Sequence, residues 1–275
     1  VCHETYKDQN NKWLSPDEIE TNDGINFNIK DEPKNQVKVG PSESMSKSKK
    51  NTIDPQKIIK DYGADAVRLF ILSDSPPEKD VQWSDQGMVA SYKFIQKFWL
   101  LHKKIMLKIT SNDENENSKS LANFTNTLID KVTKNLEKFH YNVIVANFHE
   151  TYNFLNKEIE KPINGFELAE NYKKILCLLQ PIIPHLALEC LNEVDKKYNP
   201  TWPLANLKLI KKETYNIVIQ IDGKKRGLLI SVSSGTEEQL IKRIKKDDVI
   251  SKFIKDKKIK KSIYIKDKLI NLITE

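Results

Sequence analysis

Residues 44–55 read Ser-Met-Ser-Lys-Ser-Lys-Lys-Asn-Thr-Ile-Asp-Pro, a run of hydroxyls and lysines that ends at a helix start. Gly40 and Pro41 precede the run and are typical of a mobile loop. Asp54 is a preferred N-cap, and Pro55 suits the first helical position because no N–H is needed there. A cationic loop on a helix start favours binding of a polyanion such as a triphosphate. A Lys/Ser run is more often a solvated loop, so taken alone it does not decide between the two.

Three further motifs follow this run. They are Asp61-Tyr62-Gly63-Ala64-Asp65-Ala66-Val67-Arg68, Ser75-Pro76-Pro77 and Trp83-Ser84-Asp85. With the run itself they resemble the KMSKS loop of class I aminoacyl-tRNA synthetases and the segment that follows it. Within that class the resemblance is greatest to the leucyl-tRNA synthetases. The order and spacing of four motifs is specific, and it favours the phosphate-binding interpretation of the loop.

The resemblance also implies which loop residues contact ATP. The implied ATP-binding residues are Ser44, Met45, Ser46, Lys47 and Ser48. Lys47 matches the second lysine of the family's loop, the one that meets ATP, and is the implied catalytic residue. The family's first lysine is replaced by Ser44, so this copy reads SMSKS. We expect that replacement to weaken loop closure more than it weakens the phosphate contact.

Composition limits the classes of protein that fit. At 275 residues the chain has room for two or three domains with real cores, and 39% apolar with 30% charged residues is ordinary for a globular protein. No stretch approaches the roughly 20 apolar residues of a membrane span and the start is not typical of a signal peptide, so we expect no membrane partner and a cytoplasmic location. Cys2, Cys177 and Cys190 have no metal or disulfide spacing. We therefore expect no metal site, and we expect Cys177 and Cys190 to be buried small hydrophobes.

Charge is distributed unevenly along the chain. The net charge is +7, yet residues 207–275 alone hold 18 Lys and Arg against 9 Asp and Glu. That excess of positive charge at the C-terminal end predicts a polyanionic partner there. Lys, Asn and Ile are abundant throughout the chain, so a general compositional bias is the alternative explanation.

The first 84 residues are predicted to contain short strands followed by two helices. Apolar residues alternate within 25–39, which predicts two short strands after a turn at residues 8–11. Residues 55–62 are predicted to form a helix that Gly63 ends, and residues 64–72 a second helix. The resemblance implies that residues 1–40 are the end of a catalytic domain with a remnant of the leucine-specific insertion. It further implies that residues 41–84 are the KMSKS loop and a connecting helical unit, in which we expect Arg68 to pair with Asp65 or Asp61.

Residues 85–206 are predicted to form a helical bundle of the class I anticodon-binding type. Apolar residues recur at helical spacing. The expected helices run from the cap Ser84 to about 108, over 121–139, 143–160 and 166–180, and to about 194, with a flexible polar connection over 110–119. Pro181-Ile182-Ile183-Pro184-His185 resembles a helix-breaking element of the family. We expect His185 to lie at a helix start rather than to act as a base.

From residue 207 onward the pattern predicts a small ββαββ domain. Alternating apolar residues over 215–221 and 224–232 flank the turn Asp222-Gly223, a helix is predicted over 236–246, and two further strands over 259–265 and 269–273 turn at Asp267-Lys268. The resulting fold class is α+β and multidomain, with a helical bundle as its main part. The family's corresponding domain contacts the tRNA body. Its candidate phosphate contacts here are Lys224, Lys225, Arg226, Lys257, Lys258, Lys260 and Lys261.

The resemblance implies a two-step reaction with ATP, leucine and tRNA-Leu. ATP and leucine give leucyl-adenylate and pyrophosphate, and the leucyl group then moves to the 3′ end of the tRNA. Lys47 would stabilise the charge that develops on the departing phosphates. ATP and Mg²⁺ are the implied cofactors, both bound mainly by parts of the family's fold that these residues do not include. The complete enzyme is expected to be monomeric.

Much of the family's catalytic machinery has no counterpart in this sequence. There is no HIGH motif, the five histidines lie far apart, and the leucine pocket and the editing domain are absent. We therefore expect a C-terminal fragment that activates no amino acid alone. Two alternatives remain: a non-catalytic tRNA-binding module, and a fragment of the isoleucyl, valyl or methionyl ligase. The final ββαββ unit and residues 1–19 favour leucine.

Overall fold

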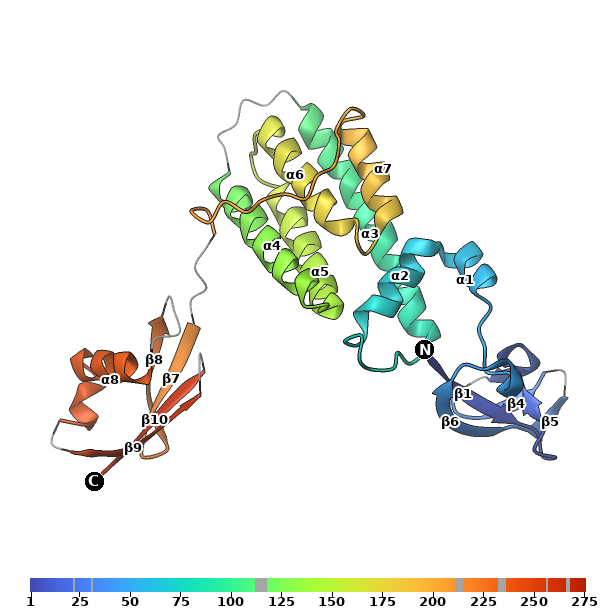
Figure 1. Ribbon diagram of the computed structural model, residues 1–275, viewed down its shortest axis with the longest axis horizontal. Helices are drawn as coiled ribbons and strands as arrows, with labels where there is room; N and C mark the ends of the chain where they lie inside the picture. The colour runs from blue at the N-terminus through green and yellow to red at the C-terminus, as the bar shows by residue number, and fades with distance from the viewer. Residues whose placement is uncertain are drawn as a thin grey trace. The chain divides into compact units, whose positions relative to one another are not determined.

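The computed structural model describes residues 1–21, 23–30, 32–111, 118–210, 215–231, 236–255, 257–265 and 268–275. The chain divides into two compact units, Val1–Ile210 and Lys211–Glu275, and each is described by itself. Helices dominate the first unit and a small sheet the second (Figure 1), in agreement with the predicted α+β class. The finer division at residues 40, 84 and 206 stays a prediction.

Two three-stranded sheets open the first unit. One has the order β2-β1-β6 and the other β3-β4-β5. The strands are β1 (Cys2–Lys7), β2 (Trp13–Leu14), β3 (Ile19–Thr21), β4 (Phe27–Ile29), β5 (Glu32–Gln36) and β6 (Lys38–Ser44), with a short 3₁₀ turn η1 (Pro16–Glu18) before β3. Tyr6, Leu14 and Val37 form the buried centre against which Phe27 packs. These strands position the residues that follow β6.

The expectation of a loop agrees with the structure over residues 45–54, where the only regular element is a 3₁₀ turn at Lys47–Lys49, but it is wrong at Gly40 and Pro41. Residues 38–44 form strand β6, which pairs antiparallel with β1 through a register shift between His3 and Thr5. A Cβ at Gly40 would lie 2.5 Å from Thr5 Oγ1, and that hydroxyl donates to Pro41 O at 3.1 Å. Gly40 is therefore needed for close approach of two strands rather than for loop freedom. Because β6 begins at Lys38, residues 25–39 hold two strands and the start of a third, instead of the two predicted.

Helices α1 (Pro55–Tyr62) and α2 (Ala64–Ser73) confirm the predicted pair. Asp54 caps α1 by accepting from Gln56 N–H at 2.9 Å. Gly63 joins the helices at φ +83° and ψ 153°, a region that only glycine adopts readily. Its N–H donates to Ile59 O at 2.8 Å, so α1 ends with its carbonyl satisfied.

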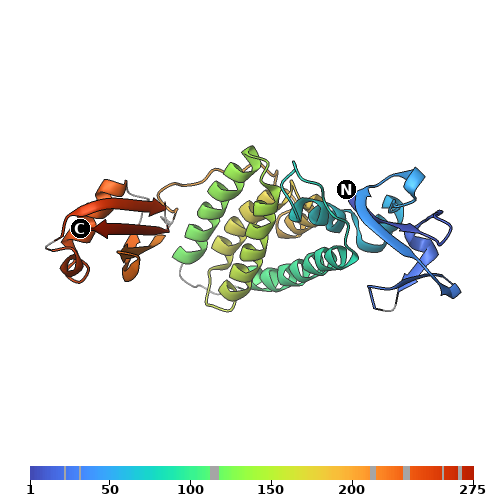
Figure 2. The same cartoon turned by 90° about the horizontal axis from the view of Figure 1, so that it is seen from below.

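Five helices then build the bundle (Figure 1). They are α3 (Asp85–Thr110), α4 (Lys119–Glu137), α5 (Tyr141–Glu158), α6 (Gly165–Leu179) and α7 (Pro184–Val194), each close to its predicted range. Figure 2 shows α3, α4 and α5 from below. Phe98, Phe148 and Tyr172 are fully buried at their centre, and Cys177 and Cys190 are buried as predicted. The predicted connection at 110–119 lies largely outside the described residues. Among the described helices, none is both long and apolar enough to cross a membrane.

The predicted partners of Arg68 are wrong. Arg68 Nε donates to Ile182 O at 2.9 Å and Nη2 to Pro181 O at 2.7 Å. These carbonyls lie in the turn between α6 and α7, where backbone acceptors lack helical partners, so the guanidinium on α2 satisfies them. Residue spacing alone could not identify acceptors more than a hundred positions away. Arg68 therefore ties α2 to the bundle.

The second unit is the predicted ββαββ fold. It consists of β7 (Tyr215–Ile221), β8 (Lys224–Ser231), α8 (Glu237–Lys246), a 3₁₀ turn η3 (Ser251–Phe253), β9 (Ile259–Ile265) and β10 (Leu269–Thr274). The sheet has the order β8-β7-β10-β9, with β10 parallel to β7. Leu240 and Ile244 of α8 pack on its buried face, and Asp222 and Gly223 turn at φ 52° and 76°. Residue 232 and Asp267, where a strand end and a turn were predicted, lie outside the described residues.

Candidate functional site

The five implied ATP-binding residues occupy a strand end and a single tight turn. Ser44 ends β6 opposite Cys2, and Met45 packs on the small core of Ala66, Phe70, Trp83 and Met88. Ser46 precedes a 3₁₀ turn, η2 (Lys47–Lys49), which places Lys47 and Ser48 in solvent. The Oγ atoms of Ser46 and Ser48 lie 2.7 Å apart. The structure thus brings together the hydroxyls of the two residues that flank Lys47 in the sequence.

Asn51 lies beneath this turn and was missed from the sequence. Its side chain is completely buried. Its Oδ1 accepts from Ser46 N–H at 2.8 Å, and its Nδ2 donates to His3 O at 3.2 Å and to Glu43 O at 3.1 Å. The signal available in the sequence was an uncharged amide that follows two lysines and precedes the start of a helix. We call Ser46–Asn51, with these bonds, the Lys47 turn.

Charges around the turn are matched except at its tip. Lys49 pairs with Glu43, and Lys50 Nζ lies 3.1 Å from Glu18 Oε2. The Ser15 N–H first, and Lys50 second, hold the pKa of Glu18 below its usual range. In the described part of the chain Lys47 has no carboxylate partner. Its ammonium is therefore the uncompensated charge of the turn.

This arrangement can bind phosphate oxygens. An exposed ammonium with two adjacent hydroxyls offers charge-assisted hydrogen bonds to a polyphosphate. The same residues do not fit Mg²⁺, which prefers carboxylate oxygens. The nearby carboxylates of Glu43 and Glu18 are already paired with lysines, and no cluster of three metal-ligating side chains occurs among the described residues.

Strand register gathers the seven candidate phosphate-binding residues at one end of the second unit's sheet. Lys224 lies opposite Ile221, which lies beside Leu272, and Ile273 of β10 lies opposite Lys261. The backbone of Lys258 reaches the same end by accepting from Glu275 N–H at 2.9 Å. We call this group the basic end: Lys224, Lys225, Arg226, Lys257, Lys258, Lys260 and Lys261.

Two members of the basic end are engaged within the unit. The Arg226 guanidinium lies 4.4 Å from the Phe253 ring centroid, and Lys257 Nζ lies 3.5 Å from Asp222 Oδ2. The Thr274 backbone N–H, followed by other donors, lowers the pKa of Asp222, so that carboxylate is a standing partner. Arg226 and Lys257 therefore contribute less free charge than the sequence suggests. Of the described residues at this end, the other five lysines have no carboxylate partner.

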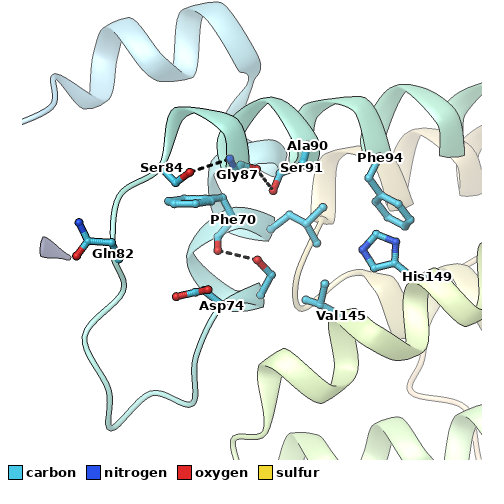
Figure 3. Close-up of a pocket in the computed structure, with 12 residues that line it drawn as sticks. Phe70, Asp74, Gln82, Ser84, Gly87, Ala90, Ser91, Phe94, Val145 and His149 are labelled. Carbon is cyan, nitrogen blue, oxygen red and sulfur yellow. Dashed lines mark hydrogen bonds between the residues drawn. The ribbon is translucent and has the colours of Figure 1, made fainter. Parts of the chain in front are cut away.

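A cleft of about 420 Å³ lies between α2, α3 and α5 (Figure 3). Its hydroxyls are already used: Ser73 donates to Phe70 O at 2.9 Å, Ser91 donates to Gly87 O at 3.0 Å, and Ser84 accepts from Gly87 N–H. His149 lies 4.3 Å from the Phe94 ring centroid, and burial followed by Lys97 lowers its pKa. These contacts describe a packing seam rather than a reactive site.

A cleft of about 730 Å³ lies where α1, α2, α3 and α7 meet. His185 lines it as the second residue of α7, so the prediction of a helix-start position is confirmed. Its Nδ1 lies 2.8 Å from Asp65 Oδ1. No Ser, Thr or Cys occurs among the described residues lining the cleft, so an Asp–His pair has no nucleophile to activate there.

Family models match the two parts that carry these features. Residues 37–84, with the Lys47 turn, match "tRNA synthetases class I (I, L, M and V)". Residues 118–262, more than half of the chain, match "Anticodon-binding domain of tRNA ligase". The chain therefore belongs to the class I tRNA ligase family that carries this domain. The resemblance predicted from four motifs is confirmed.

Within this class the chain is similar to leucine–tRNA ligases. It is 36% identical over 278 residues to the enzyme of Orientia tsutsugamushi and 35% identical over 277 residues to that of Rickettsia bellii. Both matches cover 99% of this chain and 32–33% of the relative, so the chain spans about a third of their length. The fold is also similar, with a TM-score of 0.63 and 24% identity, to Agrobacterium radiobacter K84 LeuRS in a ternary LeuRS–tRNA–LeuAMS complex, over 85% of this chain and 32% of that one.

Proposed function

We propose that this chain supplies the ATP-contacting turn and the tRNA-binding helices of a leucine–tRNA ligase. The observation that carries the proposal is the exposed Lys47 ammonium, which has no carboxylate partner within the described residues although its neighbours Lys49 and Lys50 do. An ammonium left without a carboxylate partner, next to two lysines that have one, is available to a ligand. Similarity to leucine–tRNA ligases over 99% of the chain supports leucine as the amino acid.

Lys47 acts in the first step of the proposed reaction. The leucine carboxylate attacks the α-phosphate of ATP, leucyl-adenylate forms, and pyrophosphate leaves with growing negative charge. An ammonium that closes on the β- and γ-phosphates stabilises that charge more than it stabilises bound ATP, which lowers the barrier. Ser46 and Ser48 donate to the same oxygens. Mg²⁺, when bound by the complete enzyme, supplies further neutralisation of phosphate charge.

The bundle and the basic end serve the second step, in which the leucyl group moves to tRNA-Leu. Phosphate contacts from lysine position an RNA without reading its sequence. The five lysines of the basic end without a carboxylate partner among the described residues are Lys224, Lys225, Lys258, Lys260 and Lys261. A complete ligase of this kind would act as a cytoplasmic monomer on tRNA-Leu.

A second candidate function is tRNA binding without catalysis. The basic end belongs to a compact unit of its own, and it would hold RNA whether or not Lys47 meets ATP. This candidate predicts tRNA affinity that is indifferent to ATP and to Lys47. A ligase for isoleucine, valine or methionine would share the loop and the bundle, but the similarity to leucine–tRNA ligases over 99% of the chain favours leucine over these amino acids.

Leucine-dependent ATP–pyrophosphate exchange tests the proposal. The 275-residue chain alone should show no exchange above background. A chimeric ligase, in which this chain replaces the matched third of the Orientia tsutsugamushi enzyme, should show exchange that Lys47→Ala reduces about a hundredfold. Lys60→Ala, which removes an exposed lysine from α1, serves as the control and should leave the rate unchanged. Undiminished exchange in the Lys47→Ala chimera would contradict the proposal, and so would a chimera without any exchange.

A further inference from the structure

The Lys47 turn needs an internal anchor because its backbone is short of partners. A 3₁₀ turn of three residues makes few bonds of its own, and Ser46 provides no side-chain cap. The Ser46 N–H is instead bonded to the Asn51 amide oxygen, while the Asn51 NH₂ group bonds to carbonyls of β1 and β6. One buried side chain therefore joins three segments.

The backbone conformation of Lys50 makes this arrangement possible. Lys50 has φ 53°, a left-handed conformation that is unfavourable for a non-glycine residue. Its N–H closes the turn on Lys47 O at 3.2 Å, and the reversal sends Asn51 back under Ser46. The bonds of Asn51 help to offset the unfavourable conformation of Lys50.

The ion pairs around the turn are weaker anchors than Asn51. The side chains of Lys49 and Glu43 are 37% and 35% exposed, and those of Lys50 and Glu18 are 40% and 44% exposed. Pairs this open to solvent contribute little and are screened by salt. A fully buried amide with its donors and acceptor bonded holds its partners more firmly, because any opening leaves polar groups unsatisfied.

Only asparagine fits the three bonds at this position. The site needs one acceptor for an N–H and two donors for carbonyls, at the reach of a short side chain. Aspartate supplies the acceptor but no donor, and alanine supplies neither. The chemistry of the site therefore specifies an amide.

We propose that Asn51 is a positioning residue for Lys47. By tethering Ser46 N–H, one residue before the lysine, it fixes where the Lys47 ammonium projects, and it thereby sets how well that charge meets the departing phosphates. The inference rests on the proposed function for its catalytic consequence, whereas the tether itself is a property of this chain alone.

Hydrogen exchange of the 275-residue chain tests the tether. Asn51→Ala should raise the exchange rates of the Ser46, Lys49 and Lys50 amides at least about tenfold, because the turn opens more often. Asn51→Asp keeps the acceptor and should raise the Ser46 rate less, and it replaces the alanine variant if that one does not fold. Asn126→Ala is the matched control: Asn126 is a buried bundle asparagine that donates to Ala122 O and accepts from Asn206 N–H. Unchanged exchange at Ser46 in Asn51→Ala would overturn the tether.

Kinetics of the chimeric ligase test the link to Lys47. Asn51→Ala should lower kcat for pyrophosphate exchange about tenfold or more, with the KM for leucine within about threefold of the unsubstituted chimera. The double variant Lys47→Ala/Asn51→Ala should have the same kcat as Lys47→Ala, because Asn51 acts through the Lys47 ammonium and has nothing to position once that ammonium is removed. In the control, the factors by which Asn126→Ala and Lys47→Ala each change kcat should instead multiply in the double variant.

The two experiments separate failure of this inference from failure of the proposed function. If the effects of Asn51→Ala and Lys47→Ala multiply in the double variant, Asn51 is not positioning Lys47 and the inference is wrong. If Lys47→Ala itself has no effect, the proposed function fails, and the tether is then decided by hydrogen exchange alone.

Discussion

Asp65 of α2 caps helix α7 through both of its carboxylate oxygens and binds the imidazole of His185. Asp65 Oδ2 accepts from Leu186 N–H at 2.7 Å, and Oδ1 lies 3.3 Å from His185 N and 2.8 Å from His185 Nδ1. The N-cap residue of α7, Ile183, has no side-chain acceptor for these orphan N–H groups. A carboxylate from another helix therefore caps α7 and joins α2 to the bundle.

Removing this carboxylate should destabilise the first unit. Asp65 is only 6% exposed, so Asp65→Ala leaves the buried N–H of Leu186 and the part-buried N–H of His185 without this acceptor, and we expect the free energy of unfolding to fall by about 2 kcal/mol. All four tryptophans, Trp13, Trp83, Trp99 and Trp202, lie in the first unit, so urea titration followed by their fluorescence reports on it alone. Asp61→Ala, at an exposed position of α1, is the control. Equal midpoints for Asp65→Ala and the unsubstituted chain would refute the cap.

Features built from neighbouring residues could be predicted from the sequence, and features built across the fold could not. Asp54, Pro55 and Gly63 fix the limits of α1 through local backbone chemistry, and the structure agrees at every one of them. The acceptors of Arg68 and the partners of Asp65 lie on helices that only tertiary packing brings near.

The same division holds at the candidate site. The sequence identified Lys47 from a motif, but it could not identify Asn51, whose bonds depend on β6 pairing with β1. That pairing was itself hidden, because Gly40 and Pro41 predict a loop when read without their strand partner. The charge of the basic end was predictable, but the engagement of Arg226 and Lys257 was not.

Gly63→Ala tests the conformational requirement between α1 and α2. A Cβ at this position would meet nothing within 4 Å, so crowding plays no part in the result. At φ +83° and ψ 153° a side chain is strained by roughly 1–3 kcal/mol, and we expect a loss of that size in the free energy of unfolding. The same fluorescence titration measures it, and a gain in stability would show that the link relaxes to a conformation alanine tolerates.

His102 should make the first unit less stable in mild acid. Its side chain is fully buried, with Nε2 2.9 Å from Glu193 Oε2 and Nδ1 3.1 Å from Tyr172 Oη. Burial, opposed by Glu193, lowers its pKa below the usual 6.5. The unfolded chain therefore takes up a proton near pH 6.5 that the folded chain does not, so stability is complete above that pH and declines below it.

The slope of that decline reports on His102. One proton taken up only by the unfolded chain changes the free energy of unfolding by at most about 1.4 kcal/mol per pH unit. His102→Gln should reduce the slope between pH 6.5 and pH 5, measured by urea titration, while His3 and His149, whose pKa values burial also lowers, keep part of it. His140→Gln, at an exposed position, is the control. A slope identical to that of the unsubstituted chain would exclude a neutral His102 as its cause.

The salt dependence of tRNA binding tests the basic end. Each lysine that neutralises a phosphate releases about one counterion, so the slope of log affinity against log salt falls by about one per contact removed. Lys260→Ala/Lys261→Ala should therefore lower the magnitude of that slope by about two with a leucine tRNA transcript. Lys30→Ala/Lys34→Ala, which removes the same charge from the β4–β5 segment of the first unit, should leave it unchanged. Identical slopes for the Lys260/Lys261 variant and the unsubstituted chain would mean that these lysines do not contact RNA phosphates, because losing such a contact reduces the number of counterions released on binding.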